Sequence, residues 1–384
     1  MRKLKTFIFT LCLPAIIFFF SGCWNYWEID KLGIVTGFTL DKKGDNYVEN
    51  IEIVSFESQS PETKTSSKIV QSEGKTLFDV DRNSILVSGK RFFWSHAKVV
   101  IISQDIAKEG LGDILDLIYR DIEMRLDINP LISVEPTAKE LLTLESPNQS
   151  IRSFEISEML KAEKSLAKAP DIAFYQYINS IAGKNAPAIL PAIGIETRGD
   201  KKVLAIKGTA ILKKAKLVGF LDTDESKYLL FALNQVKEGL LIVEEKSHGR
   251  KAAITLDVTG NQTKIKPKYI KGKLTMDLSI QPEVSIGELQ TTEDYIQSPQ
   301  REKLIKDAET SLEDNVRKVI RKMQVKYNSD VLGFAALIRA TNPSLWKKLE
   351  PDWDEVFRNL AVRVKAHIKV KNSALTSKPI KVGE

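Results

Sequence analysis

The chain reads PQREKLIKDAETSLEDNVRKVIRKMQVKY from Pro299 to Tyr327, and this stretch carries its clearest structural signal. Ser298 can cap a helix here, and Pro299 suits the first helical position, where its missing N–H leaves no bond unmade. Apolar residues recur at steps of three or four: Leu304, Ala308, Leu312, Val316, Ile320 and Met323. A stripe with this period predicts a long amphipathic helix packed on a core.

The segment that follows has a different period. Between Leu360 and Val370 every second residue is apolar, and the intervening residues are Arg363, Lys365, His367 and Lys369. Period two predicts a strand with one apolar face and one basic face. We expect the basic face to be solvated or paired with acidic neighbours, and a membrane- or partner-facing role is the alternative.

Shorter patterns fill the rest of the chain. We expect strands at 32–40, 47–56, 98–102, 131–134, 188–195, 203–212, 217–221, 240–244, 253–258 and 273–280, the first two forming a hairpin. Helical patterns occupy 76–87, 114–119, 151–181 and 226–236. Residues 58–67 are polar and predict an exposed loop, while Pro187 and Pro191 favour a sheet edge for the strand at 188–195.

Helices and strands are segregated along the chain rather than strictly alternating. This arrangement favours an α+β fold, with mixed or antiparallel sheets and packed helices in two or three domains. Gly199 and a cluster of charges predict a boundary near Glu196–Lys202. We therefore expect an N-terminal α+β domain at 23–195 and a C-terminal α+β domain at 196–384, which can itself divide into two.

The N-terminus has the features of an export signal. Arg2, Lys3 and Lys5 precede an apolar run of 14 residues, Phe7 to Phe20. A helix of that length covers about 21 Å, whereas a bilayer core measures about 30 Å. The run therefore suits a signal peptide, residues 1–22, that is removed from the mature protein.

The signal ends in Phe20-Ser21-Gly22-Cys23, which resembles the lipobox of bacterial lipoproteins, although Phe20 replaces the usual Leu. The resemblance implies that Cys23 carries S-diacylglycerol and an N-acyl chain of the palmitate type. A buried cysteine in an uncleaved anchor helix is the alternative. Because Cys12 lies inside the signal, Cys23 is the only thiol of the mature chain. Two or three acyl chains, at about 0.8 kcal/mol per buried methylene, attach a protein permanently to a membrane.

Nothing in the sequence points to catalysis or to a cofactor. A formal charge of +7 over 384 residues is a mild basic excess, and it indicates no nucleic-acid partner. The three histidines, His96, His248 and His367, are scattered and predict no zinc site. We read two pairs of alternate acids, Asp79/Asp81 and Asp222/Asp224, as helix-start and turn residues. We therefore expect a protein that is not an enzyme and needs no cofactor or metal.

Several stretches, taken in order, resemble the Ger(x)C family of spore germination lipoproteins, of the GerAC type. Cys23-Trp24-Asn25 is similar to the family's opening, although Asn25 replaces Asp. The further matches are Glu28-Ile29, His96-Ala97-Lys98, Ala107–Gly110, Arg120-Asp121, Arg125, Ser329-Asp330-Val331-Leu332-Gly333-Phe334, Asn342-Pro343, Trp346, Trp353 and Phe357. Leu332 departs from the Phe of the family's pattern.

The resemblance implies the C subunit of a nutrient germinant receptor in the inner membrane of the bacterial spore. Such a subunit lies on the outer, extracytoplasmic face, without enzymatic activity, beside a multi-spanning A subunit and a permease-like B subunit. A solute-binding lipoprotein that serves a membrane transporter is the alternative function, and it predicts a cleft between two lobes. An envelope hydrolase is a third hypothesis, which no motif supports.

The matched residues also carry structural expectations. We expect His96 to pair with a carboxylate at the entry to the following strand. Arg120 and Asp121 are expected to form a pair at a helix end, where a cation is favourable. Trp346 and Trp353 are expected to clamp helix ends onto the last strand, and contact with a partner is the alternative.

Overall fold

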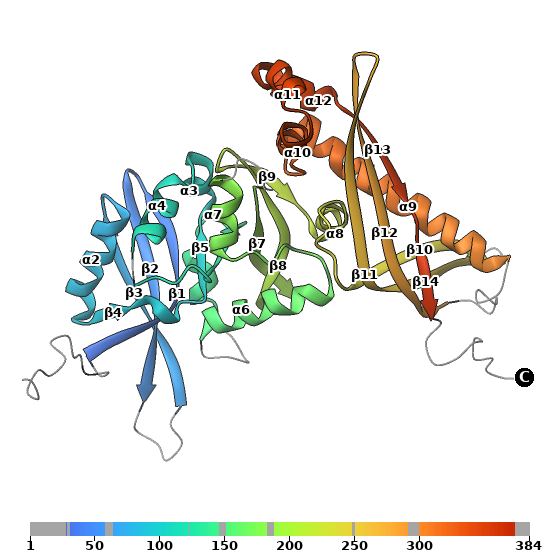
Figure 1. Ribbon diagram of the computed structural model, residues 1–384. Coiled ribbons are helices and arrows are strands. Elements are labelled where there is room, and N and C mark those ends of the chain that lie inside the picture. The colour runs from blue at the N-terminus through green and yellow to red at the C-terminus, as the bar shows by residue number, and fades with distance from the viewer. Residues whose placement is uncertain are drawn as a thin grey trace, which may run out of the picture.

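A computed structural model describes residues 28, 31–57, 64–121, 123–145, 151–182, 188–247, 250–290 and 299–372. The molecule is elongated, with a nine-stranded sheet in its N-terminal part and a five-stranded sheet in its C-terminal part (Figure 1). Both sheets are mixed and helices pack on them, so the predicted α+β class is confirmed. The signal peptide, Cys23 and His248 lie outside the described residues.

The first sheet has the order β3-β2-β1-β5-β6-β7-β8-β9, and β4 pairs with β1. Its outer thirds are antiparallel, whereas β1, β5, β6 and β7 run parallel. The predicted hairpin at its start is confirmed, with Gly44 in the turn. The strands are β1 (Leu32–Lys43), β2 (Asn46–Glu57), β3 (Lys64–Gly74), β4 (Arg91–Phe93), β5 (Val99–Ile102), β6 (Asn129–Ser133), β7 (Ile189–Arg198), β8 (Lys201–Lys213) and β9 (Lys216–Leu221).

Two expectations for this sheet are wrong. The loop expected at 58–67 already becomes strand β3 at Lys64, which pairs with Glu57 of β2. Backbone hydrogen bonds to β2 hold this polar edge strand in the sheet. Because the strand has few apolar side chains at its start, hydrophobic periodicity does not predict it. The strand at 188–195 is interior, because β7 lies between β6 and β8. Pro191 is tolerated there because the pairing with β6 begins one residue later, at Ala192.

The second sheet has the order β10-β11-β12-β13, and β14 also pairs with β12. One continuous strand was expected at 360–370, but the structure has two. Residues 367 and 368 interrupt them opposite Pro282, which has no N–H to offer the ladder. The strands are β10 (Gly239–Ser247), β11 (Arg250–Ile270), β12 (Lys273–Leu289), β13 (Ala361–Ala366) and β14 (Lys369–Asn372).

Eleven α-helices lie in the described part of the chain, and the predicted helical regions all contain at least one of them. Thr76 caps the first with its side chain, and Asp222 forms a capping box with Glu225 at α8. The helices are α2 (Leu77–Ser88), α3 (Gln104–Glu109), α4 (Gly112–Arg120), α5 (Lys139–Thr143), α6 (Arg152–Ala162), α7 (Phe174–Ala182), α8 (Thr223–Ala232), α9 (Gln300–Lys322), α10 (Phe334–Thr341), α11 (Pro343–Leu349) and α12 (Trp353–Asn359).

Helix α9 confirms the long amphipathic helix, and the whole predicted stripe is buried. Pro299 is its N-cap rather than its first residue, and Ser298 lies outside the described residues. The helix packs along β13 (Figure 1). There Glu313 accepts a hydrogen bond from the N–H of Ala366 at 3.1 Å, and Glu309 accepts one from Ile368 at 2.9 Å. The helix therefore closes the backbone edge of the second sheet.

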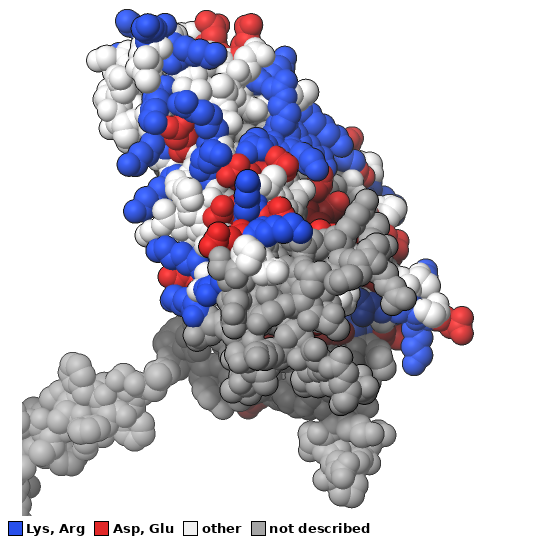
Figure 2. Space-filling model, turned by 90° about the vertical axis from the view of Figure 1, so that its right-hand side faces the viewer, with Lys and Arg blue, Asp and Glu red and all other residues white. Residues whose placement is uncertain are grey.

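The basic face of β13 is paired with acids, as one of the two expectations has it. Arg363 binds Asp277 at 2.8 Å, and Lys365 lies 3.7 Å from Glu313. Figure 2, which looks onto this end of the molecule, shows acidic side chains interspersed among the basic ones. Surface pairs of this kind contribute about 0–1 kcal/mol each, so the pattern governs solubility more than stability.

Candidate functional site

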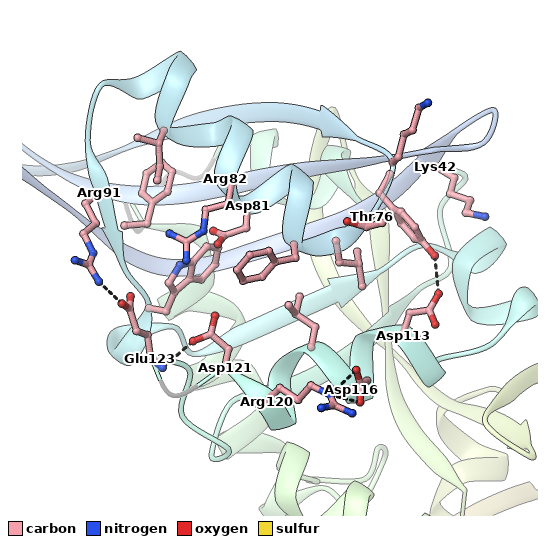
Figure 3. A pocket seen from close by; sticks show the side chains of 18 of the residues that line it. Lys42, Thr76, Asp81, Arg82, Arg91, Asp113, Asp116, Arg120, Asp121 and Glu123 are labelled. Carbon is pink, nitrogen blue, oxygen red and sulfur yellow. Dashed lines mark hydrogen bonds and ion pairs between the residues drawn. The ribbon is translucent and has the colours of Figure 1, made fainter.

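A large pocket lies between α2 and α4 and has a volume of about 1020 Å³. Helix α2 forms one wall, and α4 with the residues that follow it forms the other (Figure 3). The short β4 strand and the 3-10 turn Trp94–His96 supply Phe92 and Trp94, which are both 3% exposed. We call this site the α2–α4 pocket.

Four of the charged residues around the pocket form two ion pairs with each other. Arg91 binds Glu123 at 2.5 Å, and Arg120 binds both oxygens of Asp116 at 2.7 and 2.8 Å (Figure 3). At the far end, the hydroxyl of Tyr47 donates to Asp113. These pairs hold α4 and the chain after it in place around the pocket.

Asp81 is the deepest charged group of the α2–α4 pocket, at 8% exposed. Burial raises the pKa of its carboxyl to about 6, and the negative charges of Asp121 and Glu123 act in the same direction. Arg82 and a hydrogen bond from Trp94 oppose that rise. Behind Asp81, burial also raises the pKa of Glu49, well above its ordinary value. The pocket thus has an acidic interior.

Two of the predicted motif residues, Arg120 and Asp121, line this pocket, but they do not pair with each other. Arg120 lies in the last turn of α4 and binds Asp116 one turn earlier. Asp121 instead accepts the backbone N–H of Glu123 at 2.8 Å. The expected Arg120–Asp121 pair is therefore wrong, because an i, i+4 partner faces the arginine on the helix surface.

His96 does not have the expected carboxylate partner among the described residues. Its ring is exposed and meets the edge of Phe93 at 5.5 Å. The entry to β5 is fixed instead by the backbone, where the N–H of Lys98 donates to Thr36 at 2.7 Å. A backbone hydrogen bond, rather than the His96 side chain, thus fixes the start of β5.

Asp330 and Gly333 act together at the start of α10. The Asp330 carboxylate accepts the N–H groups of Phe334 and Ala335 at 3.0 and 2.7 Å. Gly333 has φ 71°, a left-handed conformation that other residues rarely adopt. Burial raises the pKa of Asp330 to about 6. Asp330 and Gly333 thus form the turn from which α10 begins.

Trp346 and Trp353 contact each other edge to face, with ring centroids 5.3 Å apart. Arg339 of α10 lies over the Trp346 ring, and Trp353 meets Phe357 within α12. These contacts join three short helices to one another rather than to the last strand, so the expected clamp is placed differently. Trp346 is 6% exposed in this arrangement.

Sequence reasoning missed the α2–α4 pocket, since its walls are about 40 residues apart in the chain. The sequence indicates only a helix-start role for Asp81, and no local pattern relates it to Asp121. In the structure, Phe78, one turn before Asp81, is half exposed beside the pocket, which marks a contact surface that the sequence alone does not show. Within the described residues, no helix is long and apolar enough to cross a membrane.

Two family models match the chain in succession. One is described as the spore germination protein N-terminal domain and matches residues 25–195. The other is described as spore germination B3/GerAC like, C-terminal, and matches residues 207–374. Together they leave a short gap that includes the tight turn between β7 and β8.

Curated relatives and a solved structure agree with these matches. Spore germination protein KC of Bacillus subtilis is 24% identical, with 96% of this chain and 98% of the relative covered. Spore germination protein B3 of the same organism is also 24% identical, with 93% and 95% covered. A crystal structure of the GerBC protein has the same fold, with a TM-score of 0.56, 21% identity, and 88% and 97% covered. The chain belongs to the Ger(x)C family of spore germination proteins.

Proposed function

We propose that this protein is the lipid-anchored, non-enzymatic C subunit of a spore germinant receptor. The succession of both family domains, at 25–195 and 207–374, carries the proposal, and the chain aligns with spore germination proteins KC and B3 over nearly their whole length. We place it on the outer face of the spore inner membrane, beside integral-membrane A and B subunits. Its role is to assemble the receptor and to pass on the nutrient signal.

The anchor in this proposal is lipid on Cys23, with residues 1–22 removed. It rests on the Ser21-Gly22-Cys23 sequence after a short apolar run. Metabolic labelling with an alkyne fatty acid tests it directly. We expect label on the wild type and on Cys12→Ala, which changes only the discarded signal. Cys23→Ala should lose both the label and the membrane fraction; retention of both would refute the anchor.

The receptor role is tested in spores. Deletion of the protein should slow or abolish germination triggered by one nutrient and leave the responses to others intact. Restoring the wild type or Cys12→Ala should recover that response, whereas Cys23→Ala should recover it poorly. Tagged protein purified from spore membranes should carry integral-membrane partners with it. An unchanged response of the deleted strain to every nutrient it germinates in would contradict the proposal.

The alternative of a transport-associated solute-binding lipoprotein predicts a cleft between two lobes. The α2–α4 pocket is lined only by residues between Lys42 and Glu123, so it lies within one part of the molecule. This position gives the alternative no support. The two functions differ in the partners that co-purify, a receptor assembly in one case and a transporter in the other.

A further inference from the structure

The α2–α4 pocket joins a buried acid to an aromatic floor, and we propose that it binds a small organic cation, a primary amine on an apolar body. This inference does not rest on the receptor role proposed above. It concerns the chemistry of this chain's own pocket, and binding to the purified protein tests it whatever the spores do.

The charge at the bottom of the pocket is negative, and Arg82, the neighbouring cation that lowers the pKa of Asp81, does not form an ion pair with it. Asp81 is 8% exposed and forms no ion pair among the residues that the structure describes. Asp121 and Glu123 lie on the opposite wall (Figure 3). A buried carboxylate without a counter-ion costs free energy, which a bound cation would recover.

The neighbouring arginines are engaged elsewhere. Arg91 and Arg120 bind Glu123 and Asp116, and the Arg82 guanidinium lies 4.9 Å from the ring centre of Phe78. Arg82 is exposed, so its charge sits at the mouth rather than at the bottom. A ligand therefore meets positive groups at the rim and a negative group inside, which selects against an anion at depth.

The floor of the pocket is aromatic and aliphatic. Phe92, Trp94 and Leu77 line it and are nearly fully buried, and Phe78 is half exposed at its side. Ring faces attract cations, and their apolar area favours a ligand body that displaces water. The volume of about 1020 Å³ lies near the upper end of the range of small-molecule sites.

The ionisation of Asp81 is consistent with this reading. Its pKa of about 6 reflects burial and two acidic neighbours that no fixed cation fully offsets. An ammonium group beside the carboxylate would lower that pKa again, because an opposite charge favours the ionised form. The pocket therefore gains most from a ligand that carries a positive charge into it.

The test uses two fluorinated probes with the same body and opposite charges. We suggest ¹⁹F NMR titration of the full-length protein in phosphatidylcholine nanodiscs with 4-fluorophenethylamine and with 3-(4-fluorophenyl)propionate. The amine should bind saturably, and the propionate should bind at least about tenfold more weakly than the amine. Equal binding of the two probes, or tighter binding of the propionate, would overturn the proposal. So would failure of the amine to saturate at millimolar concentration.

Variants locate the site. Asp81→Asn keeps the shape of the side chain and should weaken amine binding about tenfold or more, since it removes a charge-assisted contact. Asp200→Asn, in the exposed turn after β7, is the matched control and should change nothing. Leu117→Trp leaves all charges in place but narrows the pocket with a larger ring, and it should also weaken binding. Normal amine binding by both Asp81→Asn and Leu117→Trp, with folding verified by circular dichroism, would place the amine elsewhere and overturn the assignment.

Discussion

The carboxylate of Glu52 on β2 accepts both the N–H and the hydroxyl of Ser153, at 2.8 and 2.5 Å, and so fixes the start of α6. It also accepts the N–H of Arg152 and the hydroxyls of Thr36 and Ser67. Glu52 is fully buried, yet each of its oxygens has partners. The side chain thus joins β1, β2, β3 and a helix about 100 residues further along the chain.

Glu52→Gln should destabilise the protein by about 2–4 kcal/mol, because an amide NH₂ would face donors that the carboxylate now satisfies. Urea unfolding at neutral pH, followed by circular dichroism, measures the loss. Glu49→Gln on the same strand is the control. Glu49 has a buried oxygen without a hydrogen-bond partner and a raised pKa, so this change should be neutral or stabilising. Equal losses for the two variants would contradict the assigned role of Glu52.

Asp330 should make stability depend on pH. Its pKa rises from 3.8 to about 6 on folding, so the folded chain binds more protons than the unfolded chain between these values. The free energy of unfolding should therefore fall as pH rises from about 4 to about 6. Asp330→Asn should flatten this slope in urea titrations across that range, while Asp200→Asn should not. An unchanged slope in Asp330→Asn would show that the carboxyl is ionised throughout.

Gly219→Ala should disturb the contact between β9 and the turn after α9. A Cβ at Gly219 would overlap the ring of Tyr327, whose hydroxyl donates to the carbonyl of Phe220 at 2.6 Å. We expect a loss of about 1–3 kcal/mol, as for other overpacked sites. Gly112→Ala, where a Cβ meets open space at the start of α4, is the control and should be neutral or slightly stabilising. Thermal unfolding of the two variants side by side decides the matter, and equal stability would show that Tyr327 moves aside freely.

Amine binding in the α2–α4 pocket should weaken as pH falls. The titratable and charged groups around Asp81 are Glu49 on β2, Arg82 on α2, and Asp121 and Glu123 after α4. Because the Asp81 carboxyl has a pKa of about 6, it loses its charge below that value. The fluorinated amine should therefore bind more weakly at about pH 5 than at about pH 7.5. Asp81→Asn should show little of this dependence; an equally steep fall in that variant would assign the effect to another group.

What the sequence could predict was the local structure. The stripe from Leu304 to Met323 and the alternation around Val364 each depend on neighbours within a few residues, and the structure confirms both patterns. The full length of β11 and β12 was not predicted, because their solvent-facing positions carry lysines, threonines and serines that resemble loop sequence.

The sites depend on contacts between residues that are far apart in the chain, and local sequence patterns do not predict such contacts. Asp330 and Gly333 are close in the chain, so the sequence shows their motif although it does not show the geometry of the turn. Glu52 and Ser153 have no local signature, since a buried glutamate is recognised only when its donors are assembled around it. The same holds for Asp81 and Asp121, which face one pocket from α2 and from the chain after α4.

The two glutamates of α9 that bind backbone N–H groups at the end of β13 and just before β14 also have a consequence for behaviour in solution. An unprotected sheet edge can pair with a strand of another molecule and begin aggregation. Here an incoming strand would first have to displace Glu313, which is buried, and Glu309 from the backbone N–H groups that they occupy. Unfolding of α9 would therefore expose an unpaired strand edge together with the apolar stripe of the helix. We expect the protein to aggregate when this helix unfolds.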